Sequence, residues 1–229
     1  MRKPEVDYRE FRLRKINEPQ FSHLKLLFGW VGYFAMYYLT EKLILPQHCM
    51  PMRFALDDMI PFCEYFAIPY VLWYLLVAGS LLYFMLYDVE SFKALMKFII
   101  ITQIVAITAY VLFPTRQDLR PIVFPRDNFF TDIMKMIYSV DTNTNVCPSM
   151  HVAYSLGIAS VWLKSKDTAK WIKAGITVFC LLVCISTAFV KQHSVIDIFA
   201  AALLCILAEM LVFHKSHYST YFRRLRRAD

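Results

Sequence analysis

Long apolar runs constrain the fold of this chain more than any other feature. Most of them lack the polar face that a helix of a soluble bundle shows, and several approach the roughly 20 residues that cross a bilayer. Mean hydropathy is +0.44, which is high for a soluble domain. Because a backbone in lipid must satisfy its own hydrogen bonds, the sequence predicts an all-α, integral membrane, six-transmembrane-helix bundle. The expected spans are 24–45, 69–87, 93–113, 149–163, 171–190 and 194–213.

The same runs divide the 229 residues into three parts. Residues 1–23 form a basic N-terminal arm, residues 24–213 the six-span membrane domain and residues 214–229 a basic tail. The first 20 residues are charged and hold no apolar core segment, so we expect no cleavable signal peptide.

Two expectations concern the stretch between the first two spans. We interpret residues 52–68 as an interfacial helix, because its apolar pattern is interrupted by three acidic residues: Asp57, Asp58 and Glu64. A disulfide between Cys49 and Cys63 is one option that the sequence leaves open.

Basic residues gather on one predicted side of the membrane. Eighteen of the 25 Lys and Arg residues lie in the N-terminal arm, the turns after the second and fourth spans, and the C-terminal tail. By the positive-inside rule these segments face the cytoplasm. We therefore expect a multi-pass protein with both termini cytoplasmic and residues 143–151 on the outer face, whether periplasmic, extracellular or lumenal. The net charge of +7 fits this topology, and we expect no nucleic-acid partner because no known nucleic-acid motif accompanies it.

The stretch NTNVCPSMHVAYS, residues 143–155, places polar groups at the mouth of an apolar helix. Pro148 suits a helix beginning, and Ser149 with the free N–H groups of the first turn predicts an anion site aided by the helix dipole. His151 lies in the same turn.

A second polar group lies at the start of the last span, in STAFVKQHSVIDIFAA, residues 186–201. His193 and Asp197 are four residues apart and share a face of a helix. A carboxylate in that position can fix the histidine tautomer and leave the other nitrogen as a nucleophile, and Lys191 lies nearby. The alternative is a histidine and aspartate paired only for stability.

A third polar segment, FPTRQDLRP at residues 113–121, adds Arg116 and Arg120. All three segments lie on the same predicted face of the membrane. Two histidines, a carboxylate, a hydroxyl and several cations suit a phosphate monoester or diester. The alternative for the arginines is a solvated loop that meets lipid phosphates nonspecifically.

Two of these segments resemble motifs of the type 2 phosphatidic acid phosphatase superfamily. PSMH resembles the family's PSGH, with Met150 in place of glycine. STAFVKQHSVID resembles SRxxxxxHxxxD, where Ser186, His193 and Asp197 match and Thr187 replaces the arginine.

The third family motif, KxxxxxxRP, is matched only at its end, by Arg120 and Pro121, and Phe113 occupies the lysine position. The order of the motifs and the six expected spans also agree with the family. The resemblance covers residues 93–201 well and the remainder only in general layout.

The resemblance implies a role for each matching residue. His193 attacks phosphorus and forms a phosphohistidine, and Asp197 orients it. His151 protonates the leaving oxygen and then activates the acceptor. Arg120 and Ser149 hold the phosphoryl oxygens, and neither a metal nor another cofactor is needed.

Three further residues complete the expected phosphate-binding set. Ser186 belongs to the matched motif. Our own inference, apart from the family pattern, is that Arg116 and Lys191 replace the two cations missing at Phe113 and Thr187.

These expectations favour a membrane lipid phosphate phosphatase, whose partners are its lipid phosphate substrate and the membrane. The alternative is a lipid phosphotransferase that passes a phosphodiester headgroup to a lipid alcohol, because the sphingomyelin-synthase and inositol-phosphorylceramide-synthase branches also depart from the lysine and arginine. Three polar residues could read such a headgroup or simply form a turn: Asp141, Asn143 and Asn145. A non-catalytic phospholipid transporter is the third reading, and the oligomeric state stays open.

Overall fold

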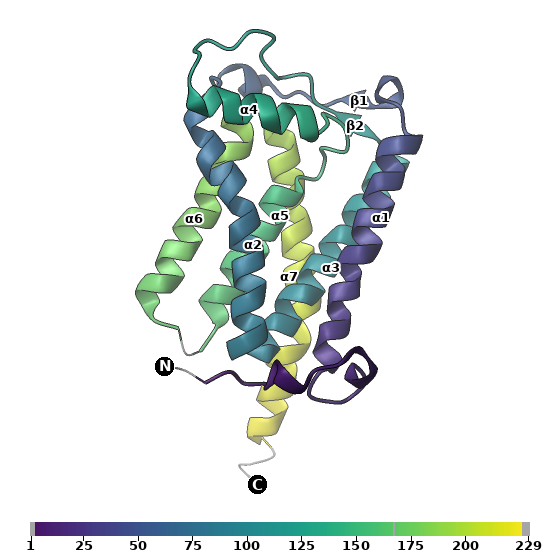
Figure 1. Ribbon diagram of the computed structural model, residues 1–229, viewed down its shortest axis with the longest axis vertical. Coiled ribbons are helices and arrows are strands. Elements are labelled where there is room, and N and C mark those ends of the chain that lie inside the picture. Colours follow the sequence, from purple (N-terminus) through teal and green to yellow (C-terminus); the bar gives the residue numbers. More distant parts are fainter. Residues whose placement is uncertain (1–2, 167, 226–229) are drawn as a thin grey trace.

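The computed structural model describes residues 3–166 and 168–225, with the side chains of the last helix described as far as residue 213. Helices run side by side along the long axis, and a shorter one, α4, lies across one end (Figure 1). The helices are α1 (Phe28–Leu43), α2 (Ala67–Tyr87), α3 (Val89–Leu112), α4 (Phe129–Val140), α5 (Met150–Lys164), α6 (Lys170–Phe189) and α7 (Val195–Leu225). The parallel pair β1 (Met50–Pro51) and β2 (Thr115–Arg116) joins two loops at the α4 end.

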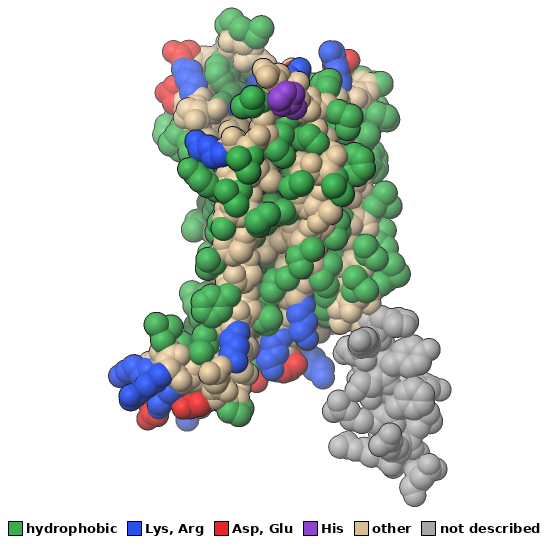
Figure 2. All heavy atoms as spheres, turned by 90° about the vertical axis from the view of Figure 1, so that its right-hand side faces the viewer, with side chains coloured by type: hydrophobic (Ala, Val, Ile, Leu, Met, Phe, Trp, Pro, Cys, Tyr) green, Lys and Arg blue, Asp and Glu red, His purple; other side chains and the backbone are tan. Residues whose placement is uncertain are grey.

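The all-α prediction is confirmed, and the helices indicate a membrane protein. Four segments are long and apolar enough to span a bilayer: Glu64–Tyr87, Val89–Leu112, Lys170–Phe189 and Val195–Phe213. Helices α1 and α5, with 16 and 15 residues, are shorter than these, so four of the six expected spans meet the requirement by their own length. Figure 2 shows hydrophobic side chains over the middle of one face and Lys and Arg at both ends.

The helix ends follow local capping chemistry. The Asp88 side chain accepts a hydrogen bond from the Ser91 N–H (3.0 Å) and caps α3, which ends just before Pro114. Asn128 accepts from the N–H groups of Phe130 and Thr131 and caps α4. The chain leaves α6 through Lys191, whose φ of 53° lies in the left-handed region and turns it directly into α7.

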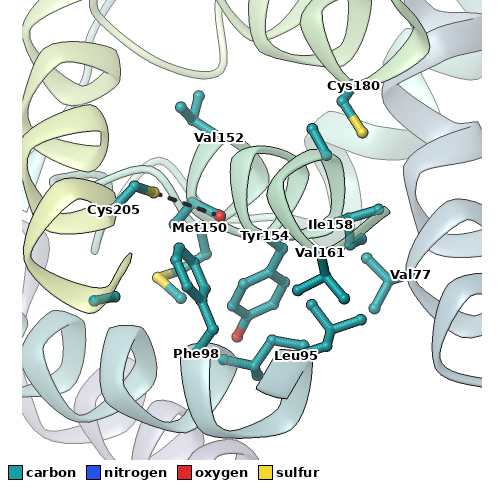
Figure 3. Close-up of a cluster of buried hydrophobic side chains, with 14 of the residues drawn as sticks. Val77, Leu95, Phe98, Met150, Val152, Tyr154, Ile158, Val161, Cys180 and Cys205 are labelled. Carbon is teal, nitrogen blue, oxygen red and sulfur yellow. Dashed lines mark hydrogen bonds between the residues drawn. The ribbon is translucent and has the colours of Figure 1, made fainter. Parts of the chain in front are cut away.

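Helix α5 is the centre of the bundle. Its side chains pack against α2, α3, α6 and α7 in the cluster that Figure 3 shows, where the Cys205 thiol also donates to the Ala153 carbonyl (3.5 Å). Gly157 permits the closest approach, because a Cβ there would lie 2.5 Å from two ring carbons of Phe98. This packing fixes the start of α5, and therefore His151, relative to α7.

The predicted interfacial helix over residues 52–68 is wrong. Two short 3₁₀ turns, Ala55–Asp58 and Glu64–Phe66, stand in its place. Pro61 lies between them and cannot donate the backbone hydrogen bond that a continuous helix needs. The helix that lies across the bundle end is α4, which the sequence analysis did not anticipate.

The structure also shows where the two ends of the described chain lie and in what state Cys49 and Cys63 are found. The described N-terminal residues and the end of α7 lie at the same end of the bundle, opposite α4 (Figure 1). Of the predicted tail, residues 226–229 lie outside the described residues, as do residues 1–2 of the arm. Cys49 and Cys63 are free thiols and form no disulfide with each other.

Candidate active site

A pocket of about 400 Å³ lies at the α4 end of the bundle, with lining residues from α1, α2, α3 and α5 and from the loops before α5 and α7. His151 and His193 both line it. Its walls are mainly aromatic: Trp30, Tyr33, Phe34, Tyr37, Trp73, Tyr74, Tyr110 and Tyr154. Its polar lining besides the histidines is Asp141, Thr142, Thr144, Asn145 and Gln192.

His193 stands in the tight turn between α6 and α7 and is 7% exposed. Its Nδ1 lies 3.0 Å from the carbonyl oxygen of Val146. A carbonyl can only accept, so this contact requires the proton on Nδ1 and leaves a lone pair on Nε2. The four-residue spacing in the sequence predicts a nucleophilic nitrogen of this kind, but with another group orienting the ring.

That other group is Asp197, which is fully buried. Its Oδ2 lies 3.4 Å from His193 Nδ1 and accepts a hydrogen bond from the Ser194 N–H at 2.9 Å. The carboxylate therefore caps the start of α7 and lies close to the imidazole, while the Val146 carbonyl is the nearer acceptor for the ring. Asp197 Oδ1 has no hydrogen-bond partner among the described residues.

His151 is held by aromatic stacking. Its ring lies 4.3 Å from Tyr70 and 4.1 Å from Trp73, centroid to centroid. Its Nε2 is buried and has no hydrogen-bond partner in the described part of the chain. Burial without a partner costs about 1–3 kcal/mol, which favours a nitrogen that bonds to a ligand. The His151 and His193 ring centroids are 5.9 Å apart, so one phosphoryl group can contact both rings.

Ser149 is fully buried and is not part of the pocket lining. Its Oγ accepts from the Val152 N–H (3.5 Å) and caps α5, and its own N–H donates to the Asp197 carbonyl (3.3 Å). The helix beginning that PSMH predicts is confirmed. The Ser149 side chain therefore acts on the site only through the backbone at the start of α5. The Ser149 N–H joins that backbone to the first turn of α7.

Arg120 stands behind the pocket and ties the loops together. Its guanidinium donates to Gln192 Oε1 (3.0 and 2.6 Å) and to the carbonyls of Asp141 (2.9 Å) and Thr142 (2.8 Å). It also lies over the Tyr138 ring at 4.6 Å. Burial lowers the pKa of Arg120 from its ordinary value, an effect that nearby Asp141 opposes. Gln192 lines the pocket and precedes His193 in the chain, so its side chain separates Arg120 from the site.

The remaining predicted phosphate ligands do not come together in the pocket. Arg116 bonds to Asp118 (3.1 Å) and to the Pro46 carbonyl (3.0 Å). Lys191 bonds to the carbonyls of Asp57 (2.7 Å) and Ile60 (2.5 Å). The Ser186 hydroxyl bonds to the Val183 carbonyl within α6.

Asp57 is a site-supporting residue that the sequence analysis missed. It is 3% exposed, and its carboxylate accepts from the Ser194 hydroxyl (2.6 Å), the Val195 N–H (2.8 Å) and the Phe54 N–H (2.7 Å). Together with the bond from Lys191 to its carbonyl, Asp57 holds the His193 turn from both sides. The signal was an acidic residue within an apolar stretch, which we assigned to an interface with water.

Of the three residues considered for headgroup recognition, two line the pocket. Asp141 Oδ2 accepts from the Tyr70 hydroxyl and from Gln192 Nε2, both at 3.0 Å, and burial raises the pKa of its carboxyl. Asn145 has φ 55° and donates to Thr40 Oγ1 (3.2 Å). Asn143 is outside the lining and donates to the Gln117 carbonyl (2.9 Å).

No group of three or more His, Cys, Asp or Glu side chains suited to a metal ion occurs among the described residues.

Comparisons with protein-family models, curated proteins and solved structures gave no match for this chain.

Proposed function

We propose that this chain is a membrane enzyme that transfers the phosphoryl group of a lipid through a phosphohistidine on His193, as the resemblance to the type 2 phosphatidic acid phosphatase superfamily implies. One observation supports it most: the Val146 carbonyl holds His193 with its lone pair on Nε2, in a pocket shared with His151. A histidine and an aspartate paired only for stability would not require a second imidazole nearby. Here the His151 ring lies 5.9 Å from the His193 ring, centroid to centroid, and its Nε2 has no hydrogen-bond partner among the described residues.

The reaction follows from this arrangement. His193 Nε2 forms a bond to phosphorus as the bond from phosphorus to the lipid oxygen breaks, and His151 gives that oxygen its proton. An acceptor oxygen then attacks the phosphohistidine, His151 takes the acceptor's proton, and the phosphorus–nitrogen bond breaks. The buried carboxylate of Asp197, 3.4 Å from Nδ1, stabilises the positive charge that the ring gains.

Backbone donors contribute to the oxyanion site. The N–H groups of Met150 and His151, in the first turn of α5, have no acceptor among the described residues. A helix N-terminus of this kind stabilises negative charge on a phosphoryl group.

The charge of the pocket favours a phosphodiester donor, and hence the lipid phosphotransferase, over a monoester. None of the described residues that line the pocket is Lys or Arg. A phosphate monoester has about two negative charges at neutral pH and a diester has one, so the diester loses less on entering a site without cations. The acceptor is then a lipid alcohol that enters from the bilayer.

The phosphatase is the second candidate, and the polar rim favours it. Thr142, Thr144 and Asn145 line the pocket beside the two histidines and would admit water as the acceptor. A phospholipid transporter is the third candidate; it would use the same pocket but form no phosphohistidine.

The test offers the purified protein three donors in a nonionic detergent: phosphatidic acid, an isoprenyl diphosphate, and a phospholipid with ceramide. Free phosphate, new lipids and acid-labile label on the protein are measured, with and without a chelator. A new phosphodiester that requires the added alcohol identifies the transferase, and phosphate equal to the dephosphorylated lipid identifies the phosphatase. The exposed His48 provides the control, since His48→Ala should label like the wild type. Lipid binding without label or product would leave the transporter, and activity lost to the chelator would contradict the metal-independent mechanism.

We also propose that the site faces the outer side of the membrane and that both termini are cytoplasmic. The distribution of basic residues in the sequence supports this orientation.

A further inference from the structure

Helix α4 has an apolar stripe that the described part of the chain leaves uncovered. Four residues recur at a spacing that places them along one side of the helix: Phe129, Ile133, Met136 and Val140. Phe129, Met136 and Val140 are 72%, 59% and 77% exposed, and Ile133 is half-buried. The stripe is distinct from the buried face of α4, which packs on the start of α2 through Met134 and Ile137. A continuous exposed apolar stripe of this kind indicates a partner.

The other exposed side of α4 is polar. It carries Asp132, Lys135 and Ser139. Lys135 donates hydrogen bonds to Asp132 (2.9 Å) and to Asp127, which precedes the helix (3.0 Å). A helix with one apolar and one charged exposed side is typical of segments that lie along a membrane surface.

The apolar stripe lies on the same side of α4 as an exposed apolar surface of α2. Phe130, which neighbours Ile133 of the stripe, meets the exposed Tyr65 ring edge to face, with the ring centroids 5.0 Å apart. Tyr65 belongs to the segment Glu64–Tyr87, which is long and apolar enough to span a bilayer. Exposed side chains continue along that segment at helical spacing: Ile68, Leu72 and Leu75. One apolar surface therefore runs from a candidate membrane span onto α4.

The polar side of α4 lies toward the loop between β2 and α4, which arches over the helix in Figure 1. Tyr138, which neighbours Lys135 on the helix, stacks on Phe124 of this loop with the ring centroids 5.9 Å apart. The polar side is therefore farther from the membrane spans than the apolar stripe is.

The depth of α4 also fits a membrane surface. At about 1.5 Å per residue, the 24 residues of Glu64–Tyr87 extend about 36 Å, whereas the hydrocarbon core of a bilayer is about 30 Å thick. The ends of this segment therefore reach the headgroup region. Helix α4 packs at one of these ends, against Ala67 and Tyr70, and lies across the bundle axis (Figure 1). Its own axis thus runs roughly parallel to the membrane plane.

We propose that α4 is an interfacial helix whose partner is the lipid of the leaflet at its end of the bundle. The apolar stripe contacts acyl chains, and the polar side meets headgroups and water. The anchored helix also supports the candidate site. The Tyr138 hydroxyl donates to the Val190 carbonyl (2.7 Å), and Asp141, which follows α4 directly, lines the pocket.

Nitroxide labels on α4 test this placement in nanodiscs of phosphatidylcholine and phosphatidylglycerol. A cysteine is introduced at Met136 of the stripe, at Ser139 of the polar side or at Leu75 of α2. The two native cysteines that are only partly buried, Cys63 and Cys147, are first replaced by alanine. Oxygen concentrates in lipid and a nickel chelate in water, so the ratio of their collision rates with the label reports its surroundings. We expect this ratio to be at least about fivefold higher for Met136→Cys than for Ser139→Cys, and close to the value for Leu75→Cys.

A second measurement uses the unmodified chain in the same nanodiscs. A phospholipid with a diazirine on its acyl chain is activated by light, and mass spectrometry identifies the residues that it modifies. We expect adducts on the apolar stripe of α4 and on the exposed side of α2, and none at Asp132 or Ser139. This result does not depend on whether the labelled variants fold.

A ratio for Met136→Cys equal to that for Ser139→Cys would overturn the inference, because the stripe would then face water. A label at position 136 that neither reagent reaches would also overturn it, since a second copy of the chain or another protein would then cover the stripe. Acyl-chain adducts on other helices, with none on α4, would overturn it in the unmodified chain. None of these measurements requires turnover, so failure of the proposed phosphoryl transfer would leave them unaffected.

Discussion

Replacing Asp57 tests whether the loop before α2 holds the turn that carries His193. Its carboxylate accepts three hydrogen bonds, from the Phe54 N–H, the Ser194 hydroxyl and the Val195 N–H, at 2.6–2.8 Å. A hydrogen bond to a charged group contributes about 1.5–3 kcal/mol, so three give about 4.5 kcal/mol at the lower end. Desolvation of the carboxylate offsets part of this, and we expect Asp57→Ala to lower the free energy of unfolding by about 2–4 kcal/mol.

The neighbouring Asp58 is a matched control. Its ion pair with Arg53 spans 2.7 Å, but the two side chains are 58% and 67% exposed, and an exposed pair contributes at most about 1 kcal/mol. Equilibrium unfolding in mixed micelles, measured for both alanine variants, separates the two expectations. Equal free energies of unfolding for Asp57→Ala and Asp58→Ala would refute the reasoning.

A second measurement separates positioning from general stability. Ser194 and Val195, which Asp57 bonds, follow His193 directly in the chain. A displaced imidazole should lower kcat and kcat/KM equally and leave KM almost unchanged, because the lost interaction exists only in the transition state. A rise in KM with unchanged kcat would mean that Asp57 acts on substrate binding instead.

Two further predictions concern the histidines and the orientation of the site. His193→Ala should abolish the phosphoenzyme. His151→Ala should lower turnover of a lipid donor by at least ~100-fold but still form the phosphoenzyme from a nitrophenyl donor, whose leaving group needs no proton. Quenched radioactive labelling measures both variants, and label that survives only in His193→Ala would reverse the two roles. A cysteine introduced at Thr142, beside Asn143, in a background without native cysteines should react with an impermeant maleimide in intact cells, and reaction only after permeabilisation would overturn the proposed topology.

The sequence was most informative where local chemistry decides the structure. The apolar runs predicted α2, α3, α6 and the start of α7 closely, because lipid-length helices need only their own backbone bonds. It was least informative in the loops. Asp57 reaches Ser194 across 137 positions of sequence, and no period or spacing predicts such a contact.

The site shows the same division. The four-residue spacing of His193 and Asp197 correctly predicted their proximity, at 3.4 Å, because both lie at one helix start. The nearer acceptor, the Val146 carbonyl, is a backbone group and leaves no trace in residue type. The positions of Arg116 and Lys191 also depend on tertiary contacts, since each bonds to a loop carbonyl far away in the chain.

The two departures from the cation pattern of the family that the chain resembles lie in different surroundings. Phe113, at the lysine position, is 64% exposed, and Thr187, at the arginine position, is fully buried with its hydroxyl bonded to the Cys184 carbonyl (2.8 Å). Neither lines the pocket, although the Thr187 carbonyl accepts hydrogen bonds from the N–H groups of Gln192 and His193 and so shapes the turn that carries His193. An arginine at 187 would have to bury its charge or displace that turn. The absence of a cation at position 187 is thus part of how the His193 turn is built, whereas Phe113 lies exposed outside that turn.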